Sequence, residues 1–268
     1  MDERESHLPD DFQFSQSSLQ DYVDCRRRFE LRYIQQLKYP AVEAEPVAEH
    51  ERHMELGDEF HRLIHQHQSG VPEALLTATI HDEMLQKWWN RYLEYGLKGI
   101  DGQRYTEVTL STSISQFRLI AKYDLLAIDP GRRLVIIDWK TSLNQPSSER
   151  MLRRLQTIVY RYVLAEAGQI LNEGQAVAPE QIEMMYWFTE YPQHPVKIEY
   201  DSQEHREAGE YLRDLIEDIK GRSTFELTDD ISHCKFCIYR SLCRRGREAG
   251  HWTDEAQDGE IDDTGNLP

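Results

Sequence analysis

Alternation of hydrophobic and polar residues in the middle of the chain predicts three consecutive β-strands. Residues 105–114 and 117–128 alternate between apolar and polar side chains, as half-buried strands do. A turn signal, Asp129-Pro130-Gly131-Arg132, follows the second strand, and an apolar run rich in β-branched residues occupies 134–137. Because short connections join antiparallel neighbours, we expect these strands to form an antiparallel meander.

Helical spacing of apolar residues surrounds this predicted meander. It predicts helices over 12–38, 49–68, 72–96, 149–167 and 211–219, and further strand patterns cover 182–189 and 196–200. In the first helix, Ser17 and Gln20 fit a capping box, Cys25 lies inside the predicted helix, and Pro40 ends it. The order of elements predicts a mixed α/β fold, in which residues 41–100 form a helical insertion before the sheet.

The third predicted strand has an unusual end. Its apolar run leads into Asp138, Trp139 and Lys140, and the two-residue period of a strand places Asp138 and Lys140 on the same side. Burying a carboxylate and an amine together is unfavourable unless each has a partner. Two explanations are open: an ordinary ion pair at a strand end, or a site that holds a metal ion and a water molecule.

Length and charge limit the classes of protein to which the chain can belong. Its 268 residues can bury a sizeable core, and no run of about 18 apolar residues predicts a membrane span. The polar start of the chain has no signal-peptide pattern, so we expect a cytoplasmic protein. The net charge is −17, of which residues 1–11 carry −4 and residues 251–268 carry −6. We interpret these segments as acidic tails, the second one disordered, around a single domain at 12–250.

Arginines form local clusters in spite of the acidic average. Arg26 and Arg27 lie in the first predicted helix, and Arg244 and Arg245 lie near the end of the predicted domain. Such clusters are ordinary solvated surface in many proteins, but phosphate contacts also need only a local basic groove. The net charge therefore does not exclude DNA as a partner, and these four arginines are candidate DNA contacts.

The four cysteines are spaced like ligands of one metal centre. Cys234, Cys237 and Cys243 define a short segment at 234–243, and Cys25 lies more than 200 residues upstream. In a cytosolic protein, cysteines favour free thiols or metal ligands over disulfides. Three near thiols and one remote thiol can supply four ligands to a single centre, and structural Zn²⁺ accepts four thiolates at such spacings. Four unrelated buried cysteines are the alternative.

Groups from different predicted elements could form a second metal site. Asp124 lies on the strand next to the one that ends at Asp138, and His61 lies on a helix that could cover the sheet. The backbone carbonyl of Trp139 is a further oxygen donor. Mg²⁺ and Mn²⁺ prefer oxygen ligands, and Mn²⁺ also accepts imidazole. Lys140 could then orient a water molecule or stabilise developing charge. Each residue alone has a simpler role, such as a packed histidine or one half of an ion pair.

Taken in order, these residues resemble the PD-(D/E)XK nuclease superfamily, in particular its RecB-like branch. The matching motifs are Gly57-x-x-x-His61, Asp124, Asp138-Trp139-Lys140 and Gln156-x-x-x-Tyr160. The resemblance implies a restriction-endonuclease-like fold with a mixed central sheet flanked by helices. The roles that it implies are metal ligation by His61, Asp124, Asp138 and the Trp139 carbonyl, and a catalytic Lys140. Gln156 and Tyr160 would form the accessory catalytic motif that helps to position the DNA and the active site beside the catalytic acids Asp124 and Asp138.

Two positions near these motifs are less regular. Ala121 stands where related nucleases usually have a glycine before the Asp124 motif. Glu107 falls where relatives often have an acid on the first strand, and a structural ion pair is the other interpretation of this residue.

The cysteine pattern resembles a subset of the same branch, the RecB-like iron–sulfur nucleases. This subset includes the CRISPR-adaptation exonucleases and the AddB-type nuclease domains. In these relatives a 4Fe-4S cluster pins the C-terminal segment onto the N-terminal helix, which implies cluster ligands at Cys25, Cys234, Cys237 and Cys243. Arg26 follows the first cysteine where many relatives have proline. Structural Zn²⁺ remains the alternative occupant.

The resemblance implies a metal-dependent DNA nuclease, acting as an exonuclease on single strands or ends in DNA repair, recombination or CRISPR adaptation. No Gly-x-x-x-x-Gly-Lys-Ser/Thr motif occurs, so nothing indicates an ATPase motor. One alternative is a DNA-binding subunit of the same fold without catalysis. Another is a nuclease that cuts only in complex with a helicase or an integrase.

Overall fold

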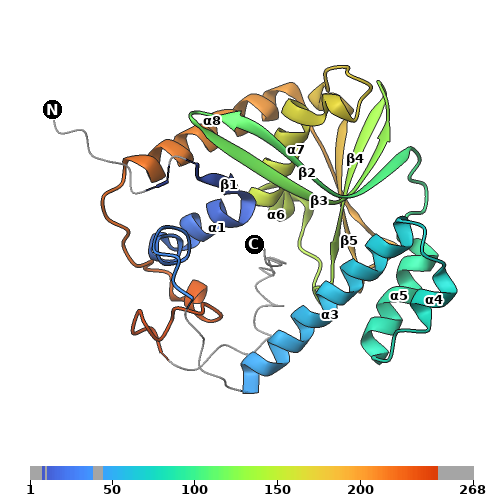
Figure 1. Ribbon diagram of the computed structural model, residues 1–268, viewed down its shortest axis with the longest axis horizontal. Helices are drawn as coiled ribbons and strands as arrows, with labels where there is room; N and C mark the ends of the chain where they lie inside the picture. The colour runs from blue at the N-terminus through green and yellow to red at the C-terminus, as the bar shows by residue number, and fades with distance from the viewer. Residues whose placement is uncertain (1–7, 10, 39–44, 247–268) are drawn as a thin grey trace.

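The structure is a computed structural model that describes residues 8–9, 11–38 and 45–246. The predicted tail at 251–268 and most of the predicted tail at 1–11 lie outside these residues. A central β-sheet is covered by helices on both faces (Figure 1). No helix in the described part of the chain is both long and apolar enough to cross a bilayer.

The sheet mixes parallel and antiparallel strands. Its strands are β1 Gln13–Ser15, β2 Gln103–Ile114, β3 Phe117–Asp129, β4 Arg133–Lys140, β5 Ile182–Phe188 and β6 Val196–Glu199. They are arranged in the order β1-β3-β4-β5-β6, with β2 paired to β3. The β2–β3 and β3–β4 pairs are antiparallel, which confirms the predicted meander, whereas β1 pairs with β3 and β4 pairs with β5 in parallel. The prediction of a mixed sheet flanked by helices is therefore confirmed.

The helices differ from the predicted ranges in several places. They are α1 Gln16–Asp24, α2 Arg26–Phe29, the π-helix Glu30–Ile34, α3 Glu45–Gln68, α4 Glu73–Thr77, α5 Glu83–Tyr95, α6 Ser148–Leu152, α7 Leu155–Ala167 and α8 Ser202–Gly221. The predicted helix over 72–96 is two helices, because Asp82 caps the start of α5. The helix predicted at 211–219 begins earlier, after the cap Asp201.

The start of the chain departs most from the prediction. Residues Gln13–Ser15 form strand β1, and the capping box of α1 pairs Ser15 with Ser18 rather than Ser17 with Gln20. Cys25 does not lie inside a helix, because its extended backbone (φ −159°, ψ 106°) separates α1 from α2. The short strand orients α1 against the sheet, where Leu19 is fully buried.

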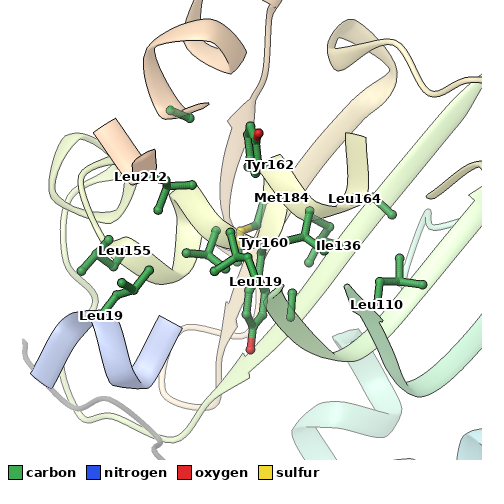
Figure 2. Packing of buried hydrophobic residues seen from close by; sticks show 14 of the residues in the cluster. Leu19, Leu110, Leu119, Ile136, Leu155, Tyr160, Tyr162, Leu164, Met184 and Leu212 are labelled. Carbon is green, nitrogen blue, oxygen red and sulfur yellow. The ribbon is translucent and has the colours of Figure 1, made fainter. Parts of the chain in front are cut away.

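Two hydrophobic cores lie on the two faces of the sheet. The first contains apolar side chains of α1, α7 and α8, and Figure 2 shows Leu19, Leu155, Leu164, Met184 and Leu212 among its residues. The second core lies beneath α3 and α5 and includes Trp139, whose ring contacts those of Tyr92 and Trp187 edge-on. The Trp139 ring therefore turns away from Asp138 and Lys140, as strand alternation predicts.

One edge of β3 changes partner along its length. At one end of that edge β3 pairs with β1 through residues 118–120, and at the other end it pairs with β4 through residues 125–129. Within the described residues, 121–124 pair with neither β1 nor β4 on this edge, and β2 occupies the other edge. The sheet is thus open beside Asp124, at the end of β4.

Candidate active site

Two aspartates face each other where β3 and β4 separate. The last paired residues of these strands are Leu125 and Ile137, so the next position places Asp124 opposite Asp138. Like charges directly opposite each other on neighbouring strands are destabilising unless other charges compensate them. The antiparallel turn predicted at 129–132 thus brings together two acids that are 14 positions apart in the chain.

Asp138 is buried between a lysine and an amide. Its Oδ2 lies 2.9 Å from the Lys140 Nζ, and both side chains are only 3–4% exposed. Its Oδ1 accepts a hydrogen bond of 2.7 Å from the Gln156 Nε2, in the first turn of α7. The position of Lys140 on the same side as Asp138 agrees with the two-residue period of the strand.

The two aspartates differ in their electrostatic environments. Burial raises the pKa of Asp138 to about 6, and the charge of Asp124 adds to this rise while that of Lys140 opposes it. Burial also disfavours the charged form of Asp124, but the charge of His61 and hydrogen bonds from His61 and Trp139 hold the pKa of Asp124 below its usual value. Asp124 is therefore the more readily ionised of the pair.

His61 and Trp139 contact Asp124 from two directions. His61, on α3, has its Nδ1 at 3.4 Å from the Asp124 Oδ2. The Trp139 N–H donates to the same oxygen at 3.1 Å. Because the N–H and C=O of one strand residue point to the same edge, the Trp139 carbonyl also points towards the opening beside β3. In agreement, the next carbonyl, that of Lys140, points the other way and accepts from Thr189 N–H at 2.9 Å.

Gln156 and Tyr160 lie one turn apart on α7 and face the same cavity. Burial raises the pKa of the Tyr160 hydroxyl well above its usual value. The Tyr160 carbonyl accepts a hydrogen bond of 2.9 Å from the hydroxyl of Tyr123, which fixes α7 on β3. Helix α7 thereby holds the amide of Gln156 against Asp138.

A cavity of about 340 Å³ contains this cluster. It is lined by the predicted residues His61, Asp124, Asp138, Lys140, Gln156 and Tyr160. Gln16, Arg62 and Lys122 also line it and were not predicted from the sequence. Lys122 is close to Asp124 on the predicted strand, and this proximity is the signal that could have pointed to it. Gln16 could not, because β1 was not recognised.

The donors around the cavity fit a divalent cation. Within the described residues, no three His, Cys, Asp or Glu side chains already stand close enough to hold a metal ion as they are. The Gln156 Oε1, however, is buried without a hydrogen-bond partner. Two opposed carboxylates and a strand-end carbonyl supply the oxygen donors that Mg²⁺ and Mn²⁺ prefer, and Mn²⁺ also accepts an imidazole such as that of His61.

The four cysteines converge on a second, small cavity. Cys25, at the break after α1, lines it together with Cys234, Cys237 and Cys243, and none of the four forms a disulfide. Burial raises the pKa of the last three thiols, and the nearby thiols add to the rise. Thiolates this close together repel one another, which adds to the resistance of each of these thiols to ionisation. A bound metal ion attracts the thiolates and offsets that repulsion, so such a group of thiols suits a bound cation.

The segment that carries the three C-terminal cysteines packs on the N-terminal helices. The Tyr239 hydroxyl donates to the Leu37 carbonyl at 2.7 Å, and the Arg27 N–H donates to the Glu226 carbonyl at 3.1 Å. Two segments that are about 200 residues apart are thus adjacent around the cysteines. The fold thus places the four cysteines around one cavity, although in the described residues no three of them stand close enough to hold a metal ion as they are.

The four candidate DNA-contacting arginines lie near this cysteine cavity. Arg26 is 3.9 Å from the Glu226 carboxylate, and Arg27 pairs with Glu30 at 2.5 Å. Arg245 lines the cysteine cavity and donates to the Thr228 carbonyl, and Arg244 beside it is exposed. Each pair directly follows a cysteine of this cavity in the chain, although acids partly neutralise the first pair.

Comparisons with known proteins are consistent with this geometry. A family model described as the PD-(D/E)XK nuclease superfamily matches residues 13–244. No curated protein matches the chain. A crystal structure of a "Putative exonuclease" from Eubacterium rectale is similar with a TM-score of 0.51 and 12% identity, and the match covers 93% of this chain and 94% of that chain. A structure described as SSO0001 has a TM-score of 0.39 and 15% identity, over 87% of this chain and 86% of that chain.

At such low identity the first of these structures supports the fold alone. The family model is the stronger finding, because it spans most of the chain and includes both opposed aspartates, Lys140 and the α7 residues. The chain belongs to the PD-(D/E)XK nuclease superfamily.

Proposed function

We propose that this protein is a metal-dependent deoxyribonuclease of the RecB-like type that hydrolyses phosphodiester bonds at single strands or ends. The observation that carries the proposal is the opposed pair Asp124 and Asp138 at the open strand edge, where Asp138 is buried and lies 2.9 Å from Lys140 while Asp124 stays partly exposed. An ion pair alone would not need the second acid, which increases the repulsion at this position.

The residues that would hold the cation are His61, Asp124, Asp138 and the carbonyl of Trp139. Members of this superfamily typically use Mg²⁺ or Mn²⁺. When bound, such an ion lowers the pKa of a water molecule and neutralises charge on the scissile phosphate. Burial raises the pKa of Asp138, whereas His61 helps to hold the pKa of Asp124 below its usual value, so a bound cation would favour the ionised form of Asp138 in particular.

The remaining cavity residues orient these ligands and the substrate. Lys140 is a cation beside Asp138 and is placed to stabilise charge that develops on the phosphate. Gln156 holds Asp138 through its Nε2 and leaves its Oε1 towards the cavity for a water molecule or a substrate donor. Tyr160 lines the cavity together with Gln156, one helical turn further along α7. These roles support nuclease chemistry rather than a purely structural ion pair.

The test of this function uses labelled single-stranded DNA with purified full-length protein. We expect Mn²⁺ or Mg²⁺ to support cleavage and EDTA to abolish it, because the two opposed carboxylates would repel a phosphate unless a cation lies between them. DNA binding without cleavage in Mn²⁺ would favour the non-catalytic subunit. Cleavage that starts only after a helicase or an integrase is added would favour the partner-dependent nuclease. Lengths and end groups of the products would separate exonuclease from endonuclease action.

The cysteine cavity supports the assignment to the iron–sulfur subset. We infer that Cys25, Cys234, Cys237 and Cys243 hold a 4Fe-4S cluster, with structural Zn²⁺ as the second candidate. The supporting observation is that all four thiols line one cavity between the chain ends. Because this cavity is separate from the one that contains Asp138, the cluster would join the chain ends rather than take part in the hydrolysis. A role in DNA repair, recombination or CRISPR adaptation accompanies this assignment.

The exposed arginines beside the cysteine cavity are the candidate DNA-binding rim. We expect Arg244→Glu combined with Arg245→Glu to weaken binding to single-stranded DNA and to lower the slope of log affinity against log salt by about 1.4, or about 0.7 for each lost phosphate contact. Fluorescence anisotropy in EDTA, over a series of salt concentrations, measures both quantities.

The matched control reverses two exposed cations away from both cavities, with Arg132→Glu and Lys98→Glu. It changes the net charge by the same amount, so a comparable loss of affinity in the control would assign the effect to overall charge. Unchanged affinity and slope in the rim variant would reject the DNA-binding rim.

A further inference from the structure

Lys122 occupies the stretch of β3 between the acids and the start of α1. Ser15 of β1 pairs with Ile120, so Lys122 and then Asp124 follow at two-residue steps along β3. All four residues line the same cavity. Lys122 is therefore the cation nearest along the strand to the proposed metal ligands, on the side where the cavity continues towards α1.

The charge of Lys122 is at present engaged by Glu107. The two side chains form an ion pair within the cavity, with exposed fractions of 48% and 30%. A pair this exposed contributes little to stability. A phosphate group that enters the cavity can therefore replace the carboxylate as the partner of Lys122 without unfolding anything.

The backbone holds Glu107 in a strained conformation opposite Asp124. Its φ is +54°, in the left-handed region that non-glycine residues rarely adopt. Tyr123 and Leu126 of β3 both turn into the first core although they are three residues apart, so the two-residue alternation is interrupted at Asp124. A local break of this kind redirects a side chain, and such breaks are common beside active sites. Here it directs the Glu107 carboxylate to Lys122.

The end of the cavity next to α1 also offers a polar group to a ligand. Gln16, the first residue of α1, is 9% exposed, and its Oε1 is buried without a hydrogen-bond partner. From Ile120, beside this end, to Asp124 the strand spans about 13 Å at its usual rise per residue. That length exceeds a single phosphate group, so a nucleic-acid strand that reaches the acids extends past Lys122 towards Gln16.

We propose that Lys122 binds the phosphate next to the scissile phosphate. In the absence of DNA, Glu107 is the counter-ion of Lys122, and the DNA phosphate takes its place. The inference rests on the proposed nuclease function and adds a substrate-binding residue and its internal competitor. Because Glu107 competes with DNA for Lys122, removing the Glu107 charge strengthens DNA binding, and removing Lys122 makes the charge of Glu107 irrelevant.

The experiment measures binding of labelled single-stranded DNA by anisotropy in EDTA, where neither cleavage nor metal ligation by Glu107 interferes. We expect Lys122→Gln to weaken binding about fivefold and to lower the salt slope by about 0.7, while Lys122→Arg retains both. Glu107→Gln is expected to strengthen binding about threefold in the wild-type background and not at all in the Lys122→Gln background, which is the signature of direct coupling.

The control pair is Lys197 and Glu183, an exposed lysine and its acidic neighbour 3.9 Å away, on β6 and β5 outside this cavity. Lys197→Gln and Glu183→Gln change the net charge equally and should leave affinity nearly unchanged. Wild-type affinity and slope in Lys122→Gln, or equal effects of Glu107→Gln in both backgrounds, would overturn the inference. In that case Mn²⁺-dependent cleavage by the wild type would still uphold the nuclease. Conversely, a wild type that shows the coupled binding pattern but cleaves neither alone nor with a helicase or an integrase would refute the nuclease and leave Lys122 only as a contact to a DNA phosphate.

Discussion

Replacement of either Asp138 or Lys140 by alanine is expected to slow Mn²⁺-dependent DNA cleavage by at least about 1000-fold. Asp138→Ala removes one of the two opposed carboxylates and the acceptor of the Gln156 hydrogen bond. Lys140→Ala removes the cation that lies 2.9 Å from that carboxylate. Both losses act on the reacting centre, so the rate of cleavage of end-labelled single-stranded DNA is the direct measurement.

The buried ion pair of Asp138 and Lys140 also affects the stability of the fold. A variant that replaces both residues separates this effect from the effect on cleavage. Removing one partner of a buried ion pair leaves an uncompensated charge, whereas replacing both with neutral groups of similar size is often neutral or stabilising. We therefore expect Asp138→Asn combined with Lys140→Met to be inactive but to unfold, in EDTA, at nearly the wild-type temperature. Loss of activity then cannot be attributed to loss of the fold.

Metal binding supplies a readout that does not depend on catalysis. A ligand that binds only the folded state stabilises it by about 2.7 kcal/mol at 100 times its Kd. Such a stabilisation raises the melting temperature. The wild type should therefore melt at a higher temperature in Mn²⁺ than in EDTA, whereas the double variant should melt at the same temperature in both. The control is Arg133→Gln with Glu183→Gln, which removes an ion pair of 2.8 Å at the opposite end of β4. It should retain both cleavage and the shift. Full activity in either alanine variant would refute the site.

The second large effect is expected at the cysteines. Cys25→Ser should remove the bound metal and release the segment with Cys234, Cys237 and Cys243 from the N-terminal helices. The wild type purified without oxygen should absorb visible light and contain about four iron atoms per chain, as a 4Fe-4S cluster requires. The variant should be colourless, and protease should cut it in the released segment. We expect its unfolding free energy to fall by several kcal/mol, because binding energy at a structural metal site is folding energy.

The control is a variant that loses one hydrogen bond between the C-terminal cysteine segment and the N-terminal part of the chain but keeps all four cysteines. Tyr239→Phe removes the bond from the Tyr239 hydroxyl to the Leu37 carbonyl and should reduce stability by only about 1 kcal/mol, with the metal retained. A colourless wild type with one zinc ion would assign the site to Zn²⁺. A wild type with neither iron nor zinc would contradict a metal centre at these cysteines.

Local patterns account for the parts of the fold that were predicted correctly. The alternation along β2 and β3, the turn before Arg133 and the apolar run of β4 depend on neighbouring residues, and they sufficed to predict the meander. The periodicity of α7 likewise placed Gln156 and Tyr160 on one face. Strand β1 is only three residues long, too short for a period, and its parallel pairing with β3 depends on residues about 100 positions away. It was therefore missed, and the boundaries of α1 were wrong with it.

Two features follow from local patterns: Asp138 and Lys140 share one side of a strand, and four cysteines can reach one centre, because strand geometry and ligand spacing are local or countable properties. Three others arise from the folded arrangement: Asp124 stands opposite Asp138, Glu107 pairs with Lys122, and Cys25 lies at a helix break. These arrangements depend on strand register, on a left-handed backbone position and on contacts between distant segments. Packing of the whole chain selects such features, and no short stretch of sequence specifies them.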